Sequence, residues 1–569
     1  MPWQPGAGSF GVLGPPPPPL HGDPPFIDTQ QDGIQNIGNY TSLFWGPAQF
    51  MNAAIFANGQ PWVDVLAYGA DPTGVTDSTA AIQGAASAAA GGVLYFPPGT
   101  YLVSGSSTIT VPSNTDLRGN ATVKLKNSSN TTNHFWFLGS GCTVSDLTFD
   151  GNYTNQTFST SDTRGLVSIG PSVSGVSIYN CTFQNAWSNG IDNLGNNVLI
   201  QNCTFTNLGQ GTTSIFAGAV NQYAAISQVR FYHNYVSGVG LPGTNGVGIG
   251  GGTNCSHFEI VGNTFQNCSE FCIGLGTTGQ YVLIDGNYIN HSGSSNAVDL
   301  GTWSDITFSN NTVISTNTGT GIACGPPIYR FSMIGNRVIG PGAGTSSLSS
   351  GISVGGTVAL PAVQSVISNN IVYNWALSGI SVSNASNLVI SDNVTFNNGQ
   401  NTGQAGGSRC GIVVSSGANV SVTGNHSLDL QGTPTQQYGI NLTNSPTNVL
   451  VANNSFSGNG TRNANYTIGS FQGLGWASRN NIGVNPIGSF TPQSVPASGT
   501  ASSGEICDST IYITCGAGVT VSAVKIGATT ITGLTVAASS TSGPVRIEAA
   551  QTITLTYAGG TPTWQWFGD

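Results

Sequence analysis

Short runs of alternating apolar and polar residues recur along most of the chain, and each is followed by a turn rich in Asn and Gly. Examples are IQNCTFTN, IVGNTFQN, IDGNYIN, FSNNTVIS, ISNNIVYN and VANNSFSGN. This period of two is typical of β-strands with one buried face. One turn position aligns among the repeats and is occupied by Cys181, Cys203, Asn234, Asn263, Asn287, Asn311, Asn336, Asn370, Asn393, Asn425 and Asn454.

A third alternating run completes each repeat, as in GIDNL, CIGLG, AVDLG and GISVS. The aligned positions are 22 to 34 residues apart, which is the length of one solenoid coil with variable loops. Three short strands per coil predict an all-β fold, a triangular parallel β-helix of about a dozen coils. Stacking would bring the aligned Asn side chains about 4.8 Å apart, so they are predicted to form a structural ladder at an interior turn.

A single helix is predicted at the start of the stack, in DSTAAIQGAASAAAGG. Asp77 or Ser78 can cap its N-terminus, and Gly91-Gly92 can end it. Its apolar face consists of Ala81, Ile82, Ala85, Ala86 and Ala89. The open end of a β-helix has an unpaired edge and an apolar interior, so the helix is predicted to be an N-terminal cap.

The stretch VDVLAYGADPTGVTDSTAAIQGAASAAAGGVLYFPPGTYLVS resembles the N-terminal signature of the pectate-lyase-like right-handed parallel β-helix superfamily. The resemblance covers about residues 62–482 when the repeats are included. It implies a right-handed β-helix and is common in bacteriophage tailspikes and in polysaccharide lyases, hydrolases and epimerases. The signature contains no catalytic residue, so function has to be argued from the site. The residues that match are Gly69-Ala70, Gly74, Asp77-Ser78-Thr79, Ala81-Ile82, Tyr95-Phe96-Pro97-Pro98-Gly99 and Tyr101.

The chain is predicted to have four parts. Residues 1–61 are rich in Pro, Gly and aromatic residues and are interpreted as a virion-attachment or leader segment. The β-helix with its cap spans 62–484, and a Pro/Ser/Gly-rich linker spans 485–504. Residues 505–569 contain short alternating runs joined by Gly turns, which predict a small antiparallel β-domain. This C-terminal segment is similar to the small β-domains of phage tail proteins. The similarity implies a role in trimerisation or in contact with a receptor.

Charged residues make up only 6% of the chain, which has a net charge of −10 and 12 Lys and Arg residues in total. A surface for nucleic acid needs clustered cations, so nucleic acid is not expected as a partner. No apolar run reaches the length of about 18 residues needed for a membrane span, so membrane insertion is not expected. The N-terminus lacks the basic and apolar regions of a signal peptide, and ordinary secretion is therefore not expected.

These observations favour a phage tailspike, a homotrimer that binds and depolymerises host surface polysaccharide. Its N-terminal segment would attach to a phage tail or adaptor protein. The protein would be located in the virion and be extracellular after host lysis. Two alternatives remain open: a virion adhesin or structural spike without catalysis, and a cellular secreted polysaccharide lyase or glycoside hydrolase.

Three acidic residues are candidates for catalysis. Asp192 in NGIDN and Asp299 in NAVDL align with each other and are predicted to point outward. Glu270 lies three places before Ile273, the residue equivalent to Val298. Glu270 and Asp299 are therefore expected on neighbouring coils, where their carboxyls could reach the spacing of about 6.5–9.5 Å typical of an inverting glycosidase. One would act as general acid and the other as base, with Asp192 as a third member; the alternative is that all three are solvated surface acids.

Three tryptophans are candidates for stacking on sugar rings. Trp187 and Trp375 lie in comparable turns, and Trp303 follows Asp299 closely. The alternative is that each is a packing aromatic. The coils show neither the paired aspartates of polygalacturonases nor a carboxylate cluster for calcium, so a hydrolase is favoured over a lyase, with no metal and no cofactor.

Overall fold

A computed structural model gives the fold and most side-chain positions. It describes residues 54–55, 61–105, 107–127, 136–156, 164–211, 217–222, 225–276, 278–326, 328–343, 347–357, 362–465, 477–484, 488–490, 494–503, 508–548 and 551–568. The predicted attachment segment 1–61 lies almost entirely outside the described residues.

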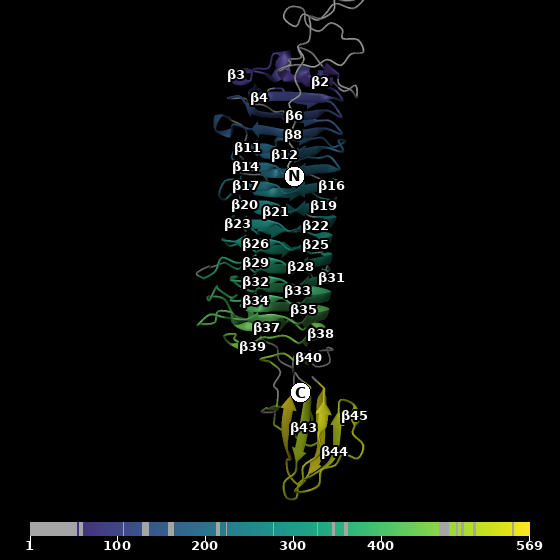
Figure 1. The fold of residues 1–569 in the computed structure, drawn as a ribbon. Coiled ribbons are helices and arrows are strands. Elements are labelled where there is room, and N and C mark those ends of the chain that lie inside the picture. The colour runs from purple at the N-terminus through teal and green to yellow at the C-terminus, as the bar shows by residue number, and fades with distance from the viewer. Residues whose placement is uncertain are drawn as a thin grey trace, which may run out of the picture. The chain divides into compact units, whose positions relative to one another are not determined.

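The alternating runs form the predicted right-handed parallel solenoid, and it has about 14 turns (Figure 1). Each coil contributes one strand to each of three sheets, called A, B and C here in the order in which the chain visits them. Every strand of these sheets pairs in parallel with the equivalent strand of the next coil, except β1 (Ala54–Ile55), which pairs antiparallel with β2.

Sheet A begins with β2 (Pro61–Asp64) and the first halves of β4 (Val93–Val103), β6 (Asp116–Leu125) and β8 (Thr143–Asp150). It continues through β10 (Ser177–Tyr179), β13 (Val198–Gln201), β16 (Ser227–Tyr232), β19 (Cys255–Val261), β22 (Gly279–Asp285), β25 (Trp303–Ser309), β28 (Tyr329–Ile334) and β31 (Ala362–Ser368). It ends with the second halves of β33 (Ile380–Ser391) and β35 (Cys410–Thr423), then β38 (Thr447–Ala452) and β40 (Ala477–Arg479).

Sheet B contains β3 (Thr73–Asp77), the second halves of β4, β6 and β8, and then β11 (Thr182–Gln184), β14 (Thr204–Leu208), β17 (Tyr235–Val239), β20 (Thr264–Cys268), β23 (Tyr288–His291), β26 (Thr312–Ser315), β29 (Arg337–Ile339), β32 (Ile371–Tyr373), β34 (Val394–Phe396) and β36 (His426–Leu428). Sheet C contains β5 (Ile109–Val111), β7 (Trp136–Leu138), β9 (Gly165–Ile169), β12 (Asn189–Asn193), β15 (Ala217–Gln222), β18 (Gly246–Gly251), β21 (Phe271–Leu275), β24 (Val298–Asp299), β27 (Ile322–Cys324), β30 (Ile352–Gly355), the first halves of β33 and β35, β37 (Tyr438–Thr443) and β39 (Arg462–Asn465). Short 3₁₀ turns lie at η1 (Val65–Tyr68), η2 (Tyr153–Asn155) and η3 (Gly406–Ser408).

The interior of the solenoid is one continuous apolar core made by the inward residues of all three sheets. In sheet B the rings of Phe149, Phe183 and Phe205 stack on one another, with centroids 5.2 and 5.0 Å apart. Equivalent inward residues of successive coils thus touch along the axis, and each coil buries its apolar face only against its neighbours.

The predicted asparagine ladder is confirmed at the turn between sheets A and B. Asn263 Nδ2 and the Asn263 backbone N–H both donate to Asn287 Oδ1, each over 2.9 Å, and Nδ2 also donates to the Phe231 carbonyl over 2.8 Å. The amide-to-amide bonds repeat along Asn234, Asn263, Asn287, Asn311, Asn336, Asn370, Asn393, Asn425, Asn454 and Asn481, all at most 2% exposed. The ladder satisfies polar backbone groups that the tight turn would otherwise bury unpaired.

The predicted capping helix is α1 (Thr79–Ala88), which lies at the N-terminal end of the stack (Figure 1). Asp77 Oδ1 accepts a bond from the Thr79 N–H over 3.0 Å, and the helix ends before Gly91, whose φ is 73°. Ile82 and Ala85 are fully buried in the same core cluster as the first coils. The helix therefore continues the apolar core and covers its open end.

Two antiparallel sheets follow the solenoid in the chain. One contains β41 (Gly488–Phe490), β48 (Thr563–Gly568), β43 (Ser509–Thr514) and β46 (Val545–Ile547), and the other β42 (Ala501–Ser503), β47 (Thr552–Ala558), β44 (Thr520–Ile526) and β45 (Thr529–Thr530). They share a separate apolar core that includes Val524 and Trp566. The stretch 485–504, predicted as a linker, supplies two of these strands, because β41 pairs with β48 and β42 with β47.

Candidate active site

The strand register brings Glu270 and Asp299 to neighbouring coils of sheet C. Glu270 directly precedes β21, and Asp299 ends β24. The two strands pair with Ile273 opposite Val298 and Gly274 opposite Asp299, as the sequence predicts. Asp299 is thus one coil away from Glu270 and displaced by about four residues along the strand. The two carboxyls are close enough for the charge of Asp299 to raise the pKa of Glu270.

Hydrogen bonds hold the main chain of Glu270 on both sides. Its N–H donates to the Gly246 carbonyl over 2.9 Å, and its carbonyl lies 2.8 Å from His291 Nε2. Burial of the half-exposed carboxyl raises its pKa, a hydrogen bond with the Ser295 side chain opposes that effect, and the Asp299 charge adds to it. The net direction is upward, so Glu270 keeps its proton to higher pH than an ordinary glutamic acid.

Asp299 is half-buried and accepts one hydrogen bond on each oxygen. The Gly301 N–H donates to Oδ1 over 2.9 Å, and Asn296 Nδ2 donates to Oδ2 over 3.2 Å. Asn296 is itself held, because its Oδ1 accepts the Thr320 N–H of the following coil over 3.2 Å. Together these two hydrogen bonds fix the orientation of the Asp299 carboxyl group.

Four residues around this pair were missed by the sequence analysis. Ser295 and Asn296 bond to the two carboxyls. His291 is fully buried behind the main chain of Glu270. Phe271 is half-buried, and its ring edge lies 3.1 Å from where a Cβ of Gly274 would stand. Their closeness in sequence to the two acids could have pointed to them, since all four lie within five residues of Glu270 or within eight of Asp299.

Asp192 shares the column of Asp299 but does not share its site. The register runs from Ile191 through Val220, Ile249 and Ile273 to Val298, which places Asp192 four coils away. This separation is about 19 Å at the spacing of parallel strands, too far for both carboxyls to act on one bond.

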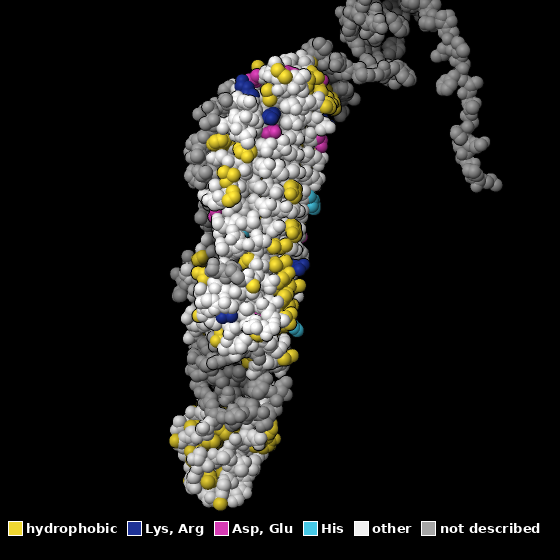
Figure 2. Space-filling model, turned by 90° about the vertical axis from the view of Figure 1, so that its left-hand side faces the viewer, with side chains coloured by type: hydrophobic (Ala, Val, Ile, Leu, Met, Phe, Trp, Pro, Cys, Tyr) yellow, Lys and Arg dark blue, Asp and Glu magenta, His cyan; other side chains and the backbone are white. Residues whose placement is uncertain are grey.

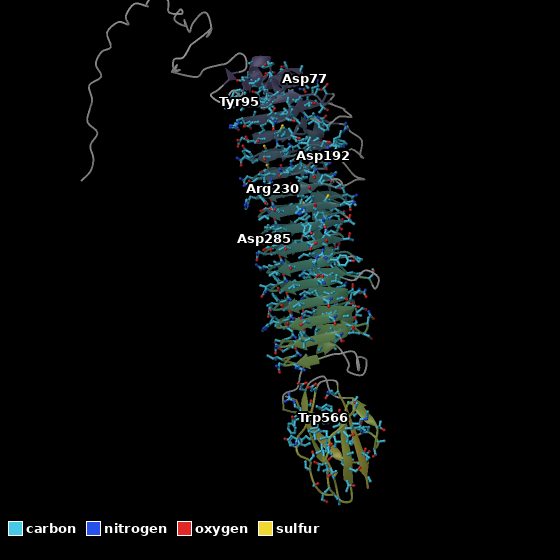
Figure 3. The ribbon with its side chains drawn as sticks, turned by 90° about the vertical axis from the view of Figure 1, so that its right-hand side faces the viewer. Asp77, Tyr95, Asp192, Arg230, Asp285 and Trp566 are labelled. Carbon is cyan, nitrogen blue, oxygen red and sulfur yellow. The ribbon has the colours of Figure 1, made fainter. Side chains whose placement is uncertain are left out.

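The predicted exposure of Asp192 is also wrong. Its side chain is only 1% exposed, and it accepts bonds from the Gly165 N–H over 2.5 Å and from Asn189 Nδ2 over 2.7 Å. Figure 3 shows Asp192 in the upper half of the solenoid. Its contacts tie β12 to β9, which is a structural role.

Trp303 and Trp375 are fully buried, so the prediction that they stack on sugar rings is wrong. Trp303 Nε1 donates to the Gly276 carbonyl over 3.1 Å, and its ring packs against Phe258 with centroids 5.2 Å apart. Trp375 Nε1 donates to the Val338 carbonyl over 3.2 Å. Both indoles fill the core with their N–H groups satisfied, and neither offers a face to a ligand.

Trp187 is half-buried and is the one predicted stacking residue that keeps exposed surface. Its carbonyl accepts the Gly211 N–H over 3.0 Å, and its ring occupies the space that a side chain at Gly211 would fill. It belongs to the coil of Asp192, four coils from Asp299. A role in sugar binding at Trp187 stays a prediction.

The acid pair has the chemistry of a general acid beside a general base. A carboxyl with a raised pKa can donate a proton to a leaving oxygen, and a neighbouring carboxylate with fixed donors can activate water. Charged residues make up only 6% of the chain, and charged side chains are few on the face of the solenoid that Figure 2 shows. A neutral or weakly charged substrate fits such a surface better than a phosphate-rich one.

Two family models match the chain. Residues 62–137 match the model described as rhamnogalacturonase A/epimerase, pectate lyase-like, and residues 164–359 match the right-handed β-helix region. The fold is that of the pectate-lyase-like right-handed parallel β-helix. The two matches cover the capped N-terminal coils and the central coils of this β-helix, which include Glu270 and Asp299.

Solved structures with low sequence identity are similar to this chain. The tailspike protein of the E. coli bacteriophage HK620, solved with a pentasaccharide, is 13% identical over 91% of this chain and 97% of that chain, with a TM-score of 0.51. Tailspike protein 3 of bacteriophage CBA120 is 14% identical over 77% of this chain and 65% of that one, with a TM-score of 0.42. The A-module of the Azotobacter vinelandii mannuronan C-5 epimerase AlgE6 is 16% identical over 76% and 100%, with a TM-score of 0.38.

No curated protein sequence matches this β-helix chain significantly. In the part of the chain that the structure describes, no helix has the length and apolar character of a membrane span.

Proposed function

We propose that this protein is a phage tailspike that binds host surface polysaccharide and cleaves it as a glycoside hydrolase. The observation that carries the proposal is the acid pair: Glu270 has a raised pKa, and Asp299 lies on the next coil with a charge that contributes to it. An inverting hydrolase needs this division between a protonated and an ionised carboxyl.

In this mechanism Glu270 donates its proton to the glycosidic oxygen as the bond to the leaving sugar breaks. Asp299 accepts a proton from a water molecule, and the resulting hydroxide bonds to the anomeric carbon from the opposite face. Asn296 and the Gly301 N–H orient Asp299, while Ser295 holds the Glu270 carboxyl. Phe271, beside Glu270, offers a partly exposed ring to the substrate.

The comparison with the HK620 tailspike supports a polysaccharide substrate, since that protein was solved with a pentasaccharide and matches most of this chain. A variant of it with one aspartate and one glutamate replaced by alanine was also solved with the pentasaccharide. For this chain we further propose a homotrimer, a virion location, extracellular release at host lysis, and attachment to the phage tail through residues 1–61. The C-terminal sheets would contribute to trimerisation or receptor contact.

The first experiment is to incubate the purified protein with surface polysaccharides of candidate bacterial hosts. Chain length is followed by size-exclusion chromatography, and unsaturated ends by ultraviolet absorbance. Shortening without new absorbance is the expected result. Shortening with new absorbance would replace the hydrolase by a lyase, and binding without shortening would leave an adhesin.

A further inference from the structure

A column of backbone in the left-handed conformation runs along the outside of sheet A, near the start of each strand. The register aligns one residue per coil in this column, each with φ between 51 and 60°. Asparagine tolerates this conformation best among residues with a side chain, and bulky residues adopt it rarely. The column consists of Asn197, Gln228, His257, Tyr281, Asp305, Arg330, Gln364, Asn387, Asn419 and Asn448.

Asparagine occupies both ends of the column, where the strain is small. Asn448 Nδ2 donates to Asn419 Oδ1, and Asn419 Nδ2 to Asn387 Oδ1, each over 3.0 Å. This arrangement shows that asparagine suits the position and forms its own outer ladder. Six consecutive coils between the ends carry other residues instead, and we call this set the ridge: Gln228, His257, Tyr281, Asp305, Arg330 and Gln364.

The ridge combines exposed aromatic rings with planar polar groups. Tyr281 is 47% exposed, and the His257 ring lies over it with centroids 4.8 Å apart and planes at 31°. Arg330 Nε and an Arg330 terminal nitrogen bond to the two oxygens of Asp305 over 2.6 and 2.8 Å. The ion pair leaves the ridge with no net charge when His257 is neutral.

We infer that the ridge is a second polysaccharide-binding surface, separate from the acid pair. Backbone strain held at six successive positions, five of them exposed and one, Asp305, half-buried, indicates a function beyond stability. Aromatic faces and paired planar donors and acceptors are the groups that recognise sugar rings and hydroxyls. One side chain per coil, about 4.8 Å apart, matches an extended polymer along the solenoid axis, and the neutral charge disfavours a phosphate backbone.

The ridge lies on the same coils as the acid pair, at the next corner. Tyr281 follows Glu270 by 11 residues, and Asp305 follows Asp299 by six. Six extended residues span at most about 20 Å, so one long chain can reach both sites. The ridge would retain long polymer while the pair cuts it; the inference depends on the proposed function only for the class of ligand.

The test measures binding of intact host polysaccharide in the Glu270→Gln background, so that the ligand is not cut. Tyr281→Asn and His257→Asn each remove a ring and insert the residue that the backbone prefers. Tyr288→Thr is the matched control, because Tyr288 is 40% exposed on the same coil in sheet B, between Thr264 and Thr312.

We expect Tyr281→Asn and His257→Asn to weaken binding by about threefold to tenfold, with thermal unfolding no lower than in the parent. Tyr288→Thr should bind like the parent. Parental binding by both ridge variants would overturn the inference and leave the proposed function intact, and equal weakening by the control would refute the assignment to the ridge. No binding by the parent to any host polysaccharide would instead refute the proposed function and the ridge with it.

Discussion

Asp299 lies one coil from Glu270, and its negative charge adds to the effect of burial in raising the pKa of the Glu270 carboxyl. Three strands of the same column separate Asp299 from Asp192, which is buried and fully hydrogen-bonded. The structure therefore places Glu270 and Asp299 on neighbouring coils, and it places Asp192, which holds strands together, apart from them.

Glu270→Gln and Asp299→Asn should each reduce polysaccharide cleavage by roughly 10²–10⁴-fold, because each removes one proton-transfer group. Reducing-end release measures the rate, and binding should persist in both variants. Trp187→Phe serves as a comparison, because Trp187 is a predicted sugar contact four coils from Asp299. This variant should reduce polysaccharide binding more than it reduces turnover. Undiminished cleavage in both acid variants would rule out this pair.

Cleavage should extend to higher pH than an ordinary glutamic acid would permit, and fall as Glu270 loses its proton. The charge of Asp299 raises the pKa of Glu270. Removing that charge should therefore lower the pKa of Glu270, and with it the pH at which activity is lost. Residual activity of Asp299→Asn should therefore decline at lower pH than wild-type activity does. A pH–rate profile of both proteins tests this, and coincident alkaline limbs would contradict it.

The thermal stability of the protein should also depend on the protonation of Glu270. A raised pKa means that the folded state favours protonated Glu270, so this contribution is present below the pKa of the unfolded chain and is lost as pH rises through the folded value. Glu270→Gln should unfold at a higher temperature than wild type at neutral pH, with the difference shrinking in acid. Calorimetry at both pH values measures it, and a pH-independent difference would count against the linkage.

Asn336→Ala should destabilise the solenoid by roughly 2–4 kcal/mol. It removes the acceptor of the Asn311 N–H and Nδ2 and the donor to the Phe308 carbonyl, all of them buried. Asn290→Ala is the control, since Asn290 is half-buried on sheet B and should change stability by less than about 0.5 kcal/mol. Denaturant unfolding compares the two, and similar losses would refute a special role for the ladder.

Trp303→Ala should reduce stability by about 3–5 kcal/mol through a cavity in the core. Because the indole is fully buried, polysaccharide affinity per folded molecule should stay unchanged. Unfolding measurements combined with binding to the folded fraction separate these effects. A loss of affinity without a loss of stability would restore Trp303 as a sugar contact.

The asparagine ladder and the placement of Glu270 and Asp299 on neighbouring coils were predictable, because both depend on strand register. The register can be read from the residue that recurs at the same turn of successive coils. The exposure of the tryptophans was not, since a buried and an exposed indole look alike in a sequence. One signal did exist for Trp303. Gly279 lies opposite Trp303 in the pairing of β22 with β25, and because glycine has no side chain, there is room for the indole ring. Asp192 aligned correctly with Asp299, but column membership alone does not give axial distance, which requires counting the coils between them.

The asparagine ladder also affects how such a chain can evolve. Each ladder residue presents the same donors to one neighbour and the same acceptor to the other. A whole repeat can therefore be duplicated or deleted, and the ladder asparagines on either side will still be able to form the same hydrogen bonds. Gene rearrangement can therefore lengthen or shorten the solenoid by whole coils without changing the pattern of its interior.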